Sequence, residues 1–124
     1  MLAKEIAEIL HAVPLTKWDE SVWDKEYSHV FATDLMSDAL ALIQDNEEST
    51  VLLTGLCNTQ TLRTAEMLDV RFIVFVRGKF LLDDAIEMAK NMGLVCLATD
   101  YTMYDACGRL YEKGLTGIYG KHSA

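Results

Sequence analysis

The stretch that decides the fold is STVLLTGLCNTQTLRTAEMLDVRFIVFVRGK, residues 49–79. It holds two apolar runs, VLL and FIVFV, and each run is followed by glycine beside polar or basic residues. The residues between the runs have helical periodicity, and Asn58 or Thr59 is suited to cap that helix. Apolar strands that alternate with helices are typical of a parallel sheet covered on both faces. The stretch therefore predicts a β-α-β unit.

The same alternation continues along most of the chain. Apolar residues at helical spacing precede it in residues 2–10, and we expect Pro14 to end that first helix. Four strands are then predicted, each followed by a helix; the strands are 27–33, 50–55, 71–76 and 94–99, and the helices are 34–43, 58–68, 83–93 and 102–114. We therefore expect an α/β fold, a three-layer sandwich with a mostly parallel sheet of four to five strands and helices on both faces, formed as a single domain by residues 1–124.

Helix ends are predicted from residues that favour them. Asp34 is expected to cap the helix after the first strand, and Asp83 is expected to open the helix after the third. Thr102 and Asp105 have the spacing of a capping box. Two glycines are expected to end helices, Gly93 and Gly114.

Composition excludes several classes of function. The 19 acidic and 11 basic residues give a net charge of −8, which repels phosphate backbones and argues against nucleic-acid binding. The apolar runs are too short to span a membrane, and the charged N-terminal stretch is unlike a signal peptide. Three cysteines without C-x-x-C spacing suit the reducing cytoplasm, where we expect the protein to reside.

Polar and small residues gather where the predicted strands end. Ligands bind in open parallel sheets beyond the carboxyl ends of the strands, and helix N-termini at that edge favour anions. Each of these residues by itself is of a type common in turns and helix caps. Their convergence at one edge of the sheet favours a binding site for a phosphate or carboxylate. The predicted ligand-binding residues are Thr54, Gly55, Asn58, Thr59, Arg77, Gly78 and Thr99.

Roles follow from the chemistry of these residues. Gly55 would allow close approach of the ligand, because it has no Cβ. Asn58 and Thr59 would donate hydrogen bonds from side chain and backbone, and Arg77 would pair with the negative charge.

Catalytic and metal sites are less well supported, and we predict neither, nor a cofactor. Cys57 precedes a helix N-terminus that could lower its pKa, but no histidine partner is evident. A magnesium site at Asp34 and Asp38 is disfavoured against a cap and a solvated carboxylate. The histidines His11, His29 and His122 lack zinc-ligand spacing, and the tail KGLTGIYGKHS fails the phosphate-loop pattern.

Three segments together resemble the DRTGG-domain family, VFATDLMSDALA (30–41), LLTGLCNTQTLRTAEMLDVRFIVFVRGK (52–79) and YTMYDACGRLYEKGL (101–115). The resemblance implies a fold similar to the N-terminal domain of HPr kinase/phosphorylase and to the regulatory domain of phosphotransacetylases. It also implies frequent dimerisation and a ligand-sensing role without catalysis of its own. The pentapeptide that names the family is absent, and TGLCN stands at the corresponding strand end.

The leading hypothesis is a non-catalytic regulatory domain that binds a small anionic metabolite, such as a nucleotide, as a homodimer or beside a partner enzyme. The alternative is a dimerisation or docking module without a small ligand. Its anchors would be the aromatic residues Trp18, Trp23, Tyr101, Tyr104, Tyr111 and Tyr119. An enzyme that uses Cys57 is the least favoured hypothesis.

Overall fold

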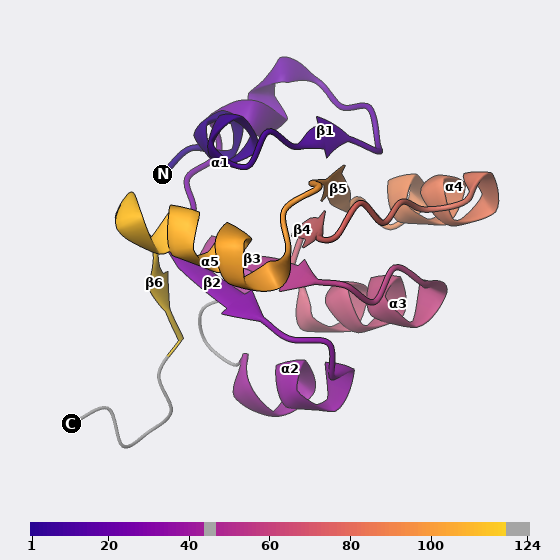
Figure 1. The fold of residues 1–124 in the computed structure, drawn as a ribbon. Coiled ribbons are helices and arrows are strands. Elements are labelled where there is room, and N and C mark those ends of the chain that lie inside the picture. The colour runs from indigo at the N-terminus through magenta and orange to yellow at the C-terminus, as the bar shows by residue number, and fades with distance from the viewer. Residues whose placement is uncertain (44–46, 119–124) are drawn as a thin grey trace.

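A six-stranded sheet forms the centre of the molecule in a computed structural model, which describes residues 1–43 and 47–118. The strand order across the sheet is β1-β5-β4-β3-β2-β6. The strands are β1 (Val13–Pro14), β2 (His29–Ala32), β3 (Thr50–Thr54), β4 (Phe72–Phe75), β5 (Val95–Ala98) and β6 (Thr116–Gly117). All neighbouring strands are parallel except β1, which runs antiparallel to β5 (Figure 1).

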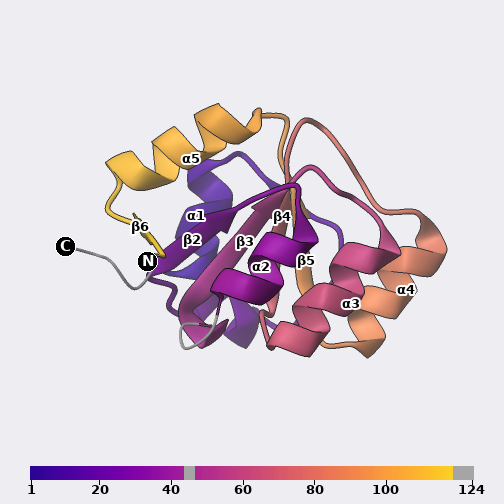
Figure 2. The same ribbon diagram turned by 90° about the horizontal axis from the view of Figure 1, so that it is seen from below.

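Helices cover both faces of the sheet, so the predicted three-layer α/β sandwich is confirmed. On one face lie α2 (Met36–Leu42), α3 (Thr59–Leu68) and α4 (Asp83–Asn91), each linking one strand to the next; α1 (Ala3–Ile9) and α5 (Met103–Glu112) lie on the other (Figures 1 and 2). Two short 3₁₀ helices complete the elements, Glu20–Asp24 and Glu47–Ser49. No helix in the described part of the chain combines the length and apolar character needed to cross a bilayer.

Each layer of helices has its own apolar core. Strands β3, β4 and β5 are wholly buried, and successive side chains point to opposite faces of the sheet. Val51 and Val74 therefore pack with α1 and α5, whereas Leu52 and Ile73 pack with α2, α3 and α4. Burial on both faces explains why these strands are continuous apolar runs in the sequence.

The sheet has six strands, whereas four to five were predicted, because β1 and β6 have little signal in the sequence. Each has only two residues and forms an outer edge of the sheet, where its partner rather than its own pattern defines it. Pro14 does not end the first helix but lies in β1, a position that an edge strand tolerates. The helix ends at Ile9, and His11 turns the chain with a φ of 49°.

The helix ends confirm part of the capping predictions. Asn58 caps α3, α4 begins at Asp83, and Gly93 and Gly114 follow α4 and α5 with positive φ. Asp34 was wrongly predicted as a cap, because α2 begins two residues later with Leu35 at its N-cap. Thr102 is the N-cap of α5, but its hydroxyl donates to Asp105 Oδ2 (3.4 Å) and no side-chain cap forms.

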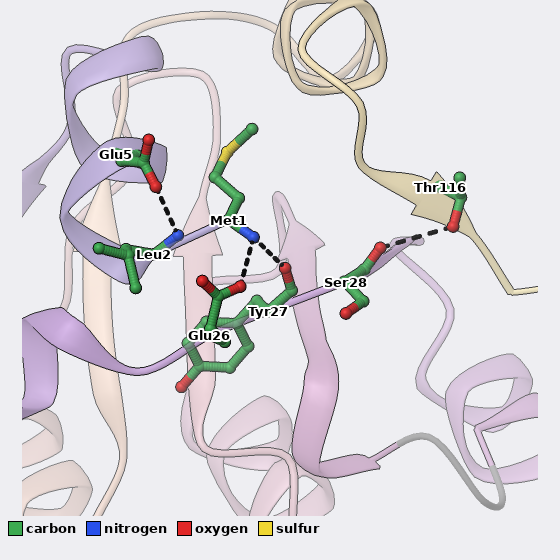
Figure 3. Close-up of polar contacts among 7 residues, drawn as sticks. All are labelled: Met1, Leu2, Glu5, Glu26, Tyr27, Ser28 and Thr116. Carbon is green, nitrogen blue, oxygen red and sulfur yellow. Dashed lines mark hydrogen bonds and ion pairs between the residues drawn. The ribbon is translucent and has the colours of Figure 1, made fainter.

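The start of the chain and β6 are both held beside the entrance to β2. The Met1 ammonium donates to Glu26 Oε2 and to the Tyr27 carbonyl, each at 2.8 Å, and Leu2 N donates to Glu5 Oε1 (Figure 3). Thr116 donates from its backbone N to the Ser28 carbonyl (3.2 Å), and its hydroxyl lies 3.5 Å from the same oxygen. Consequently β6 is fixed at the open side of β2, opposite β3.

Candidate functional site

The loops that follow the parallel strands meet at one edge of the sheet, as predicted. Backbone hydrogen bonds continue the ladders one residue beyond the strands: Thr33 N to the Leu53 carbonyl (3.0 Å), Val76 N to the Thr54 carbonyl (3.0 Å) and Thr99 N to the Phe75 carbonyl (2.9 Å). The residues after β2, β3, β4 and β5 are thereby aligned side by side. This alignment brings the predicted site residues to a common edge.

The loop between β3 and α3 is held in place by its own side chains. Asn58 Oδ1 accepts a hydrogen bond from Thr61 N (3.0 Å), which caps α3 and satisfies a free donor of its first turn. The Thr61 hydroxyl donates to the Leu56 carbonyl (2.7 Å), and Leu56 N donates to Thr54 Oγ1 (3.1 Å). Asn58 is exposed and Thr59 half-buried at the start of α3, at the positive end of the helix dipole.

A carboxylate of the protein itself lies at the end of β3. Asp34 Oδ1 accepts a hydrogen bond from Gly55 N (2.6 Å) and one from the Thr54 hydroxyl (3.3 Å). This contact was not predicted, because Asp34 was expected to cap the helix after the first strand. Two of the predicted ligand-binding residues, Thr54 and Gly55, therefore donate to Asp34 instead.

Arg77 lies directly against Gly55. A Cβ built on Gly55 would be 2.9 Å from Arg77 Nε and 3.0 Å from Cζ, and Arg77 Nη2 donates weakly to the Gly55 carbonyl (3.5 Å). Gly55 is thus required for close approach, but the group that approaches it is the guanidinium of Arg77. Among the residues that the structure describes, neither Arg77 nor Lys79 forms an ion pair.

The turn after β4 fixes the position of Arg77. Arg77 and Gly78 both have positive φ, 66° and 69°. Their backbone N–H groups donate to the carbonyls of Tyr101 (2.8 Å) and Thr99 (2.9 Å), which ties the turn to the loop after β5. Gly78 also lies close to Asp100, whose Oδ1 would be 3.2 Å from a Cβ at this position.

Thr99 belongs to the same edge, but its hydroxyl faces α1. It is buried, donates to the Leu10 carbonyl (2.6 Å) and accepts from Tyr101 N (3.2 Å). Thr54 is buried in the same way. The structure therefore brings Gly55 and Arg77 into contact and sets Asn58, Thr59 and Gly78 in the adjoining loops, whereas the hydroxyls of Thr54 and Thr99 serve the loops themselves.

Cys57 is a thiol rather than a thiolate in this setting. Burial raises its pKa to about 11, and the nearby charge of Lys79 offsets only part of this effect. The helix N-terminus therefore does not produce the lowered pKa that the sequence suggested. Within the described part of the chain, no three His, Cys, Asp or Glu side chains are grouped so that they could hold a metal ion.

A larger concave feature lies on another part of the molecule. A groove of ≈ 680 Å³ runs between α5 and strands β2 and β6, and Tyr104, Gly108 and Tyr111 are among its lining residues. A smaller hollow of ≈ 240 Å³ adjoins the predicted site and is lined by Leu10, His11 and Thr99–Tyr101. Sequence reasoning missed the groove, although the spacing of Tyr104, Gly108 and Tyr111 on one helix face was a signal for it.

Comparison with known proteins supports the fold. No protein-family model and no curated protein matches the sequence. Among solved structures, the chain is similar to the CBS and DRTGG domains of the regulatory region of pyrophosphatase from Clostridium perfringens, complexed with its activator diadenosine tetraphosphate. The similarity has a TM-score of 0.65 and 18% identity, and it covers 88% of this chain and 48% of that one. The chain thus spans about half the length of this neighbour. The fold is DRTGG-like.

Proposed function

We propose that this chain is a regulatory domain that senses a small anionic metabolite, such as a nucleotide, at the carboxyl ends of β3 and β4. The observation that carries the proposal is Arg77, an exposed guanidinium that lies on Gly55 and forms no ion pair with any described residue. An unpaired cation beside a helix N-terminus is well placed to bind phosphate or carboxylate oxygens.

Asp34 defines how an anion would bind. It already accepts from Gly55 N and the Thr54 hydroxyl, so the ligand would not use these donors. The groups left for it are Arg77, Lys79, the exposed amide of Asn58 and the first turn of α3 at Thr59. The proposed ligand therefore contacts the outer rim of the loops and not the end of β3 itself.

A nucleotide is the favoured class of ligand. The fold neighbour from Clostridium perfringens was solved with a nucleotide activator, diadenosine tetraphosphate. A nucleotide offers several phosphate oxygens, which suits two cations, Arg77 and Lys79, two residues apart. The affinities of this chain for diadenosine tetraphosphate, ATP and pyrophosphate should therefore be compared.

Substitution of Arg77 tests the proposal. Arg77→Ala should weaken binding of the tightest of these three ligands by ~1–3 kcal/mol, about fivefold to 150-fold, because a charge-assisted hydrogen bond is lost. The measurement is isothermal titration calorimetry at fixed ionic strength. Arg63→Ala is the matched control, because Arg63 is also exposed and lies on α3. Equal affinity of Arg77→Ala and the unmodified protein would contradict the proposal.

We further propose that the domain has no catalytic activity of its own and acts in the cytoplasm as a homodimer, beside a partner enzyme. The raised pKa of Cys57 supports the absence of thiol catalysis, because the nucleophile is the thiolate. The highly exposed tyrosines Tyr104 and Tyr111 support an interface between chains, since such residues anchor many interfaces. Trp18 and Trp23 are half-buried and pack against the core, which leaves them less suited to that role, and Tyr119 lies outside the described residues.

A further inference from the structure

The outer face of α5 combines two exposed tyrosines with an adjoining groove. Tyr104 and Tyr111 are 86% and 75% exposed, although tyrosine usually buries much of its ring. They are seven residues apart, two turns of helix, and therefore lie on the same face. Beside them runs the groove between α5, β2 and β6, with an apolar floor that includes Val30, Ala32 and Leu115.

Gly108 lies between the two tyrosines, in the middle of α5. Glycine weakens a helix interior relative to alanine, so its presence there needs a reason. The reason is not crowding within this chain, because a Cβ at Gly108 would meet no described atom within 4 Å. Its φ is not in the left-handed region either, unlike that of Gly114. Without a side chain, Gly108 leaves a notch on the outside of the helix, at the edge of the groove.

We propose that this face is a self-association surface, on which α5 of a second copy packs antiparallel to α5 about Gly108. A twofold interface uses the same patch on both copies, so the patch must contain both the projecting and the receiving parts. This one does: the tyrosines project, the groove beside α5 can receive them, and the notches at Gly108 of the two copies face each other and let the helices approach closely. The proposal rests on the homodimer proposed above and adds its surface, and it does not depend on anion binding.

The charges on α5 are also self-complementary. Asp105 and Arg109 lie on the same flank of the helix, four residues apart, and both line the groove. Arg109 lies over the ring of Tyr101 and Asp105 accepts a hydrogen bond from the Thr102 hydroxyl, but neither forms an ion pair with another described residue. Antiparallel packing about Gly108 sets the half of the helix that contains Arg109 against the half of the second copy that contains Asp105. Two equivalent ion pairs would form across the twofold axis.

Gly108→Leu is the decisive variant, because it fills the notch without harming the helix. Leucine is the better helix former, so the melting temperature at a dilution where both proteins are monomeric should not fall. The dissociation constant of the dimer, measured by sedimentation over a range of concentrations, should rise at least tenfold. Met67→Ser is the matched control, since Met67 is 75% exposed on α3 in the opposite layer, and it should leave that constant unchanged.

Exchange of the charges at Asp105 and Arg109 provides a second, independent test. Asp105→Arg and Arg109→Asp should each weaken the dimer, and the double variant should restore most of the loss. If the unmodified protein is monomeric at every concentration, both the homodimer and this surface are wrong. If it dimerises but Gly108→Leu dimerises equally well, the surface is wrong and the homodimer stands. Loss of association in Gly108→Leu together with rescue in the charge exchange is the expected result.

Discussion

At the scale of single residues, the contact between Gly55 and Arg77 sets the character of the site. Arg77 occupies the space that a side chain at position 55 would need, and the turn at Arg77 and Gly78 holds its backbone through two hydrogen bonds. Because the guanidinium is the flexible end of a long side chain, its position depends on the absence of a Cβ at Gly55. A small change at one residue should therefore move the charge at the other.

Gly55→Ala separates the position of the charge from its presence. The added methyl group would displace the Arg77 guanidinium while leaving the fold nearly as stable, within ~1 kcal/mol, because only a flexible side chain has to move. We expect binding of the anion to weaken almost as much as in Arg77→Ala. Calorimetry for binding and urea unfolding for stability measure the two effects, and Gly117→Ala, where a Cβ meets nothing within 4 Å, is the control. An affinity equal to that of the control would contradict this role for Gly55.

Residues whose role is local were predictable from sequence. Asn58 caps α3 and Gly93 ends α4 because each acts within its own turn of chain. Asp34 was misassigned because its partner, Gly55, is twenty-one residues away and becomes a neighbour only when β2 and β3 pair. The predicted site residues lie in loops at one edge of the sheet, but which of their polar groups remain available depends on such distant contacts.

At the scale of elements, Asp34 joins the loop that follows β2 to the loop that follows β3. Its carboxylate accepts hydrogen bonds from Gly55 N and from the Thr54 hydroxyl. The protein thus carries an internal anion next to the place where we propose an external one. The two negative charges would repel each other across a short distance.

Asp34→Ala should therefore act on stability and binding in opposite directions. Loss of a charged hydrogen bond to Gly55 N is expected to lower the free energy of unfolding by about 1–2 kcal/mol. Removal of the neighbouring negative charge, with release of that N–H group, is expected to tighten binding of pyrophosphate. Asp38→Ala, which removes an equal charge from α2 but no hydrogen bond to Gly55, is the control. It should lower stability less and tighten pyrophosphate binding less than Asp34→Ala. Weaker binding by Asp34→Ala than by Asp38→Ala would count against the account.

Helices and strands with an apolar or amphipathic pattern in their own sequence could be predicted, whereas the short strands at the edges of the sheet could not. Strands β2 to β5 and helices α2 to α5 follow from alternating apolar and amphipathic runs. Strands β1 and β6 consist of two residues each, and one of them contains Pro14. Such short strands exist only through pairing with β5 and β2, so their sequence has no period to detect.

At the scale of the whole molecule, the connections of β4 and β5 leave the sheet toward opposite faces. Strand β4 leads to α4 in one layer, and β5 leads to α5 in the other (Figure 2). Ligands of open α/β sheets bind beside such a divergence. The position of this divergence depends on the order of the strands across the sheet. That order cannot be inferred from the succession of strands along the chain. In this protein, hydrogen bonds between the Arg77–Gly78 turn and the loop at Thr99–Tyr101 connect the ends of β4 and β5 at this point.

The same bridge connects the proposed anion site with the proposed association surface. Arg77 N donates to the Tyr101 carbonyl, and the guanidinium of Arg109 on α5 lies 4.2 Å from the centre of the Tyr101 ring. A ligand bound to Arg77 would thus be connected to α5 through two contacts, Arg77 with Tyr101 and Tyr101 with Arg109. This short path gives a physical route by which a regulatory domain can pass a binding event to an interface, provided that both sites are used.

Amide chemical shifts can show whether an anion binds at the ends of β3 and β4. In a titration of the ¹⁵N-labelled protein with pyrophosphate, followed by NMR, we expect saturable shifts at Asn58, Thr59, Arg77 and Gly78. These shifts should be absent in Arg77→Ala. Saturable shifts confined to another part of the molecule, or none at millimolar pyrophosphate, diadenosine tetraphosphate or ATP, would contradict the account.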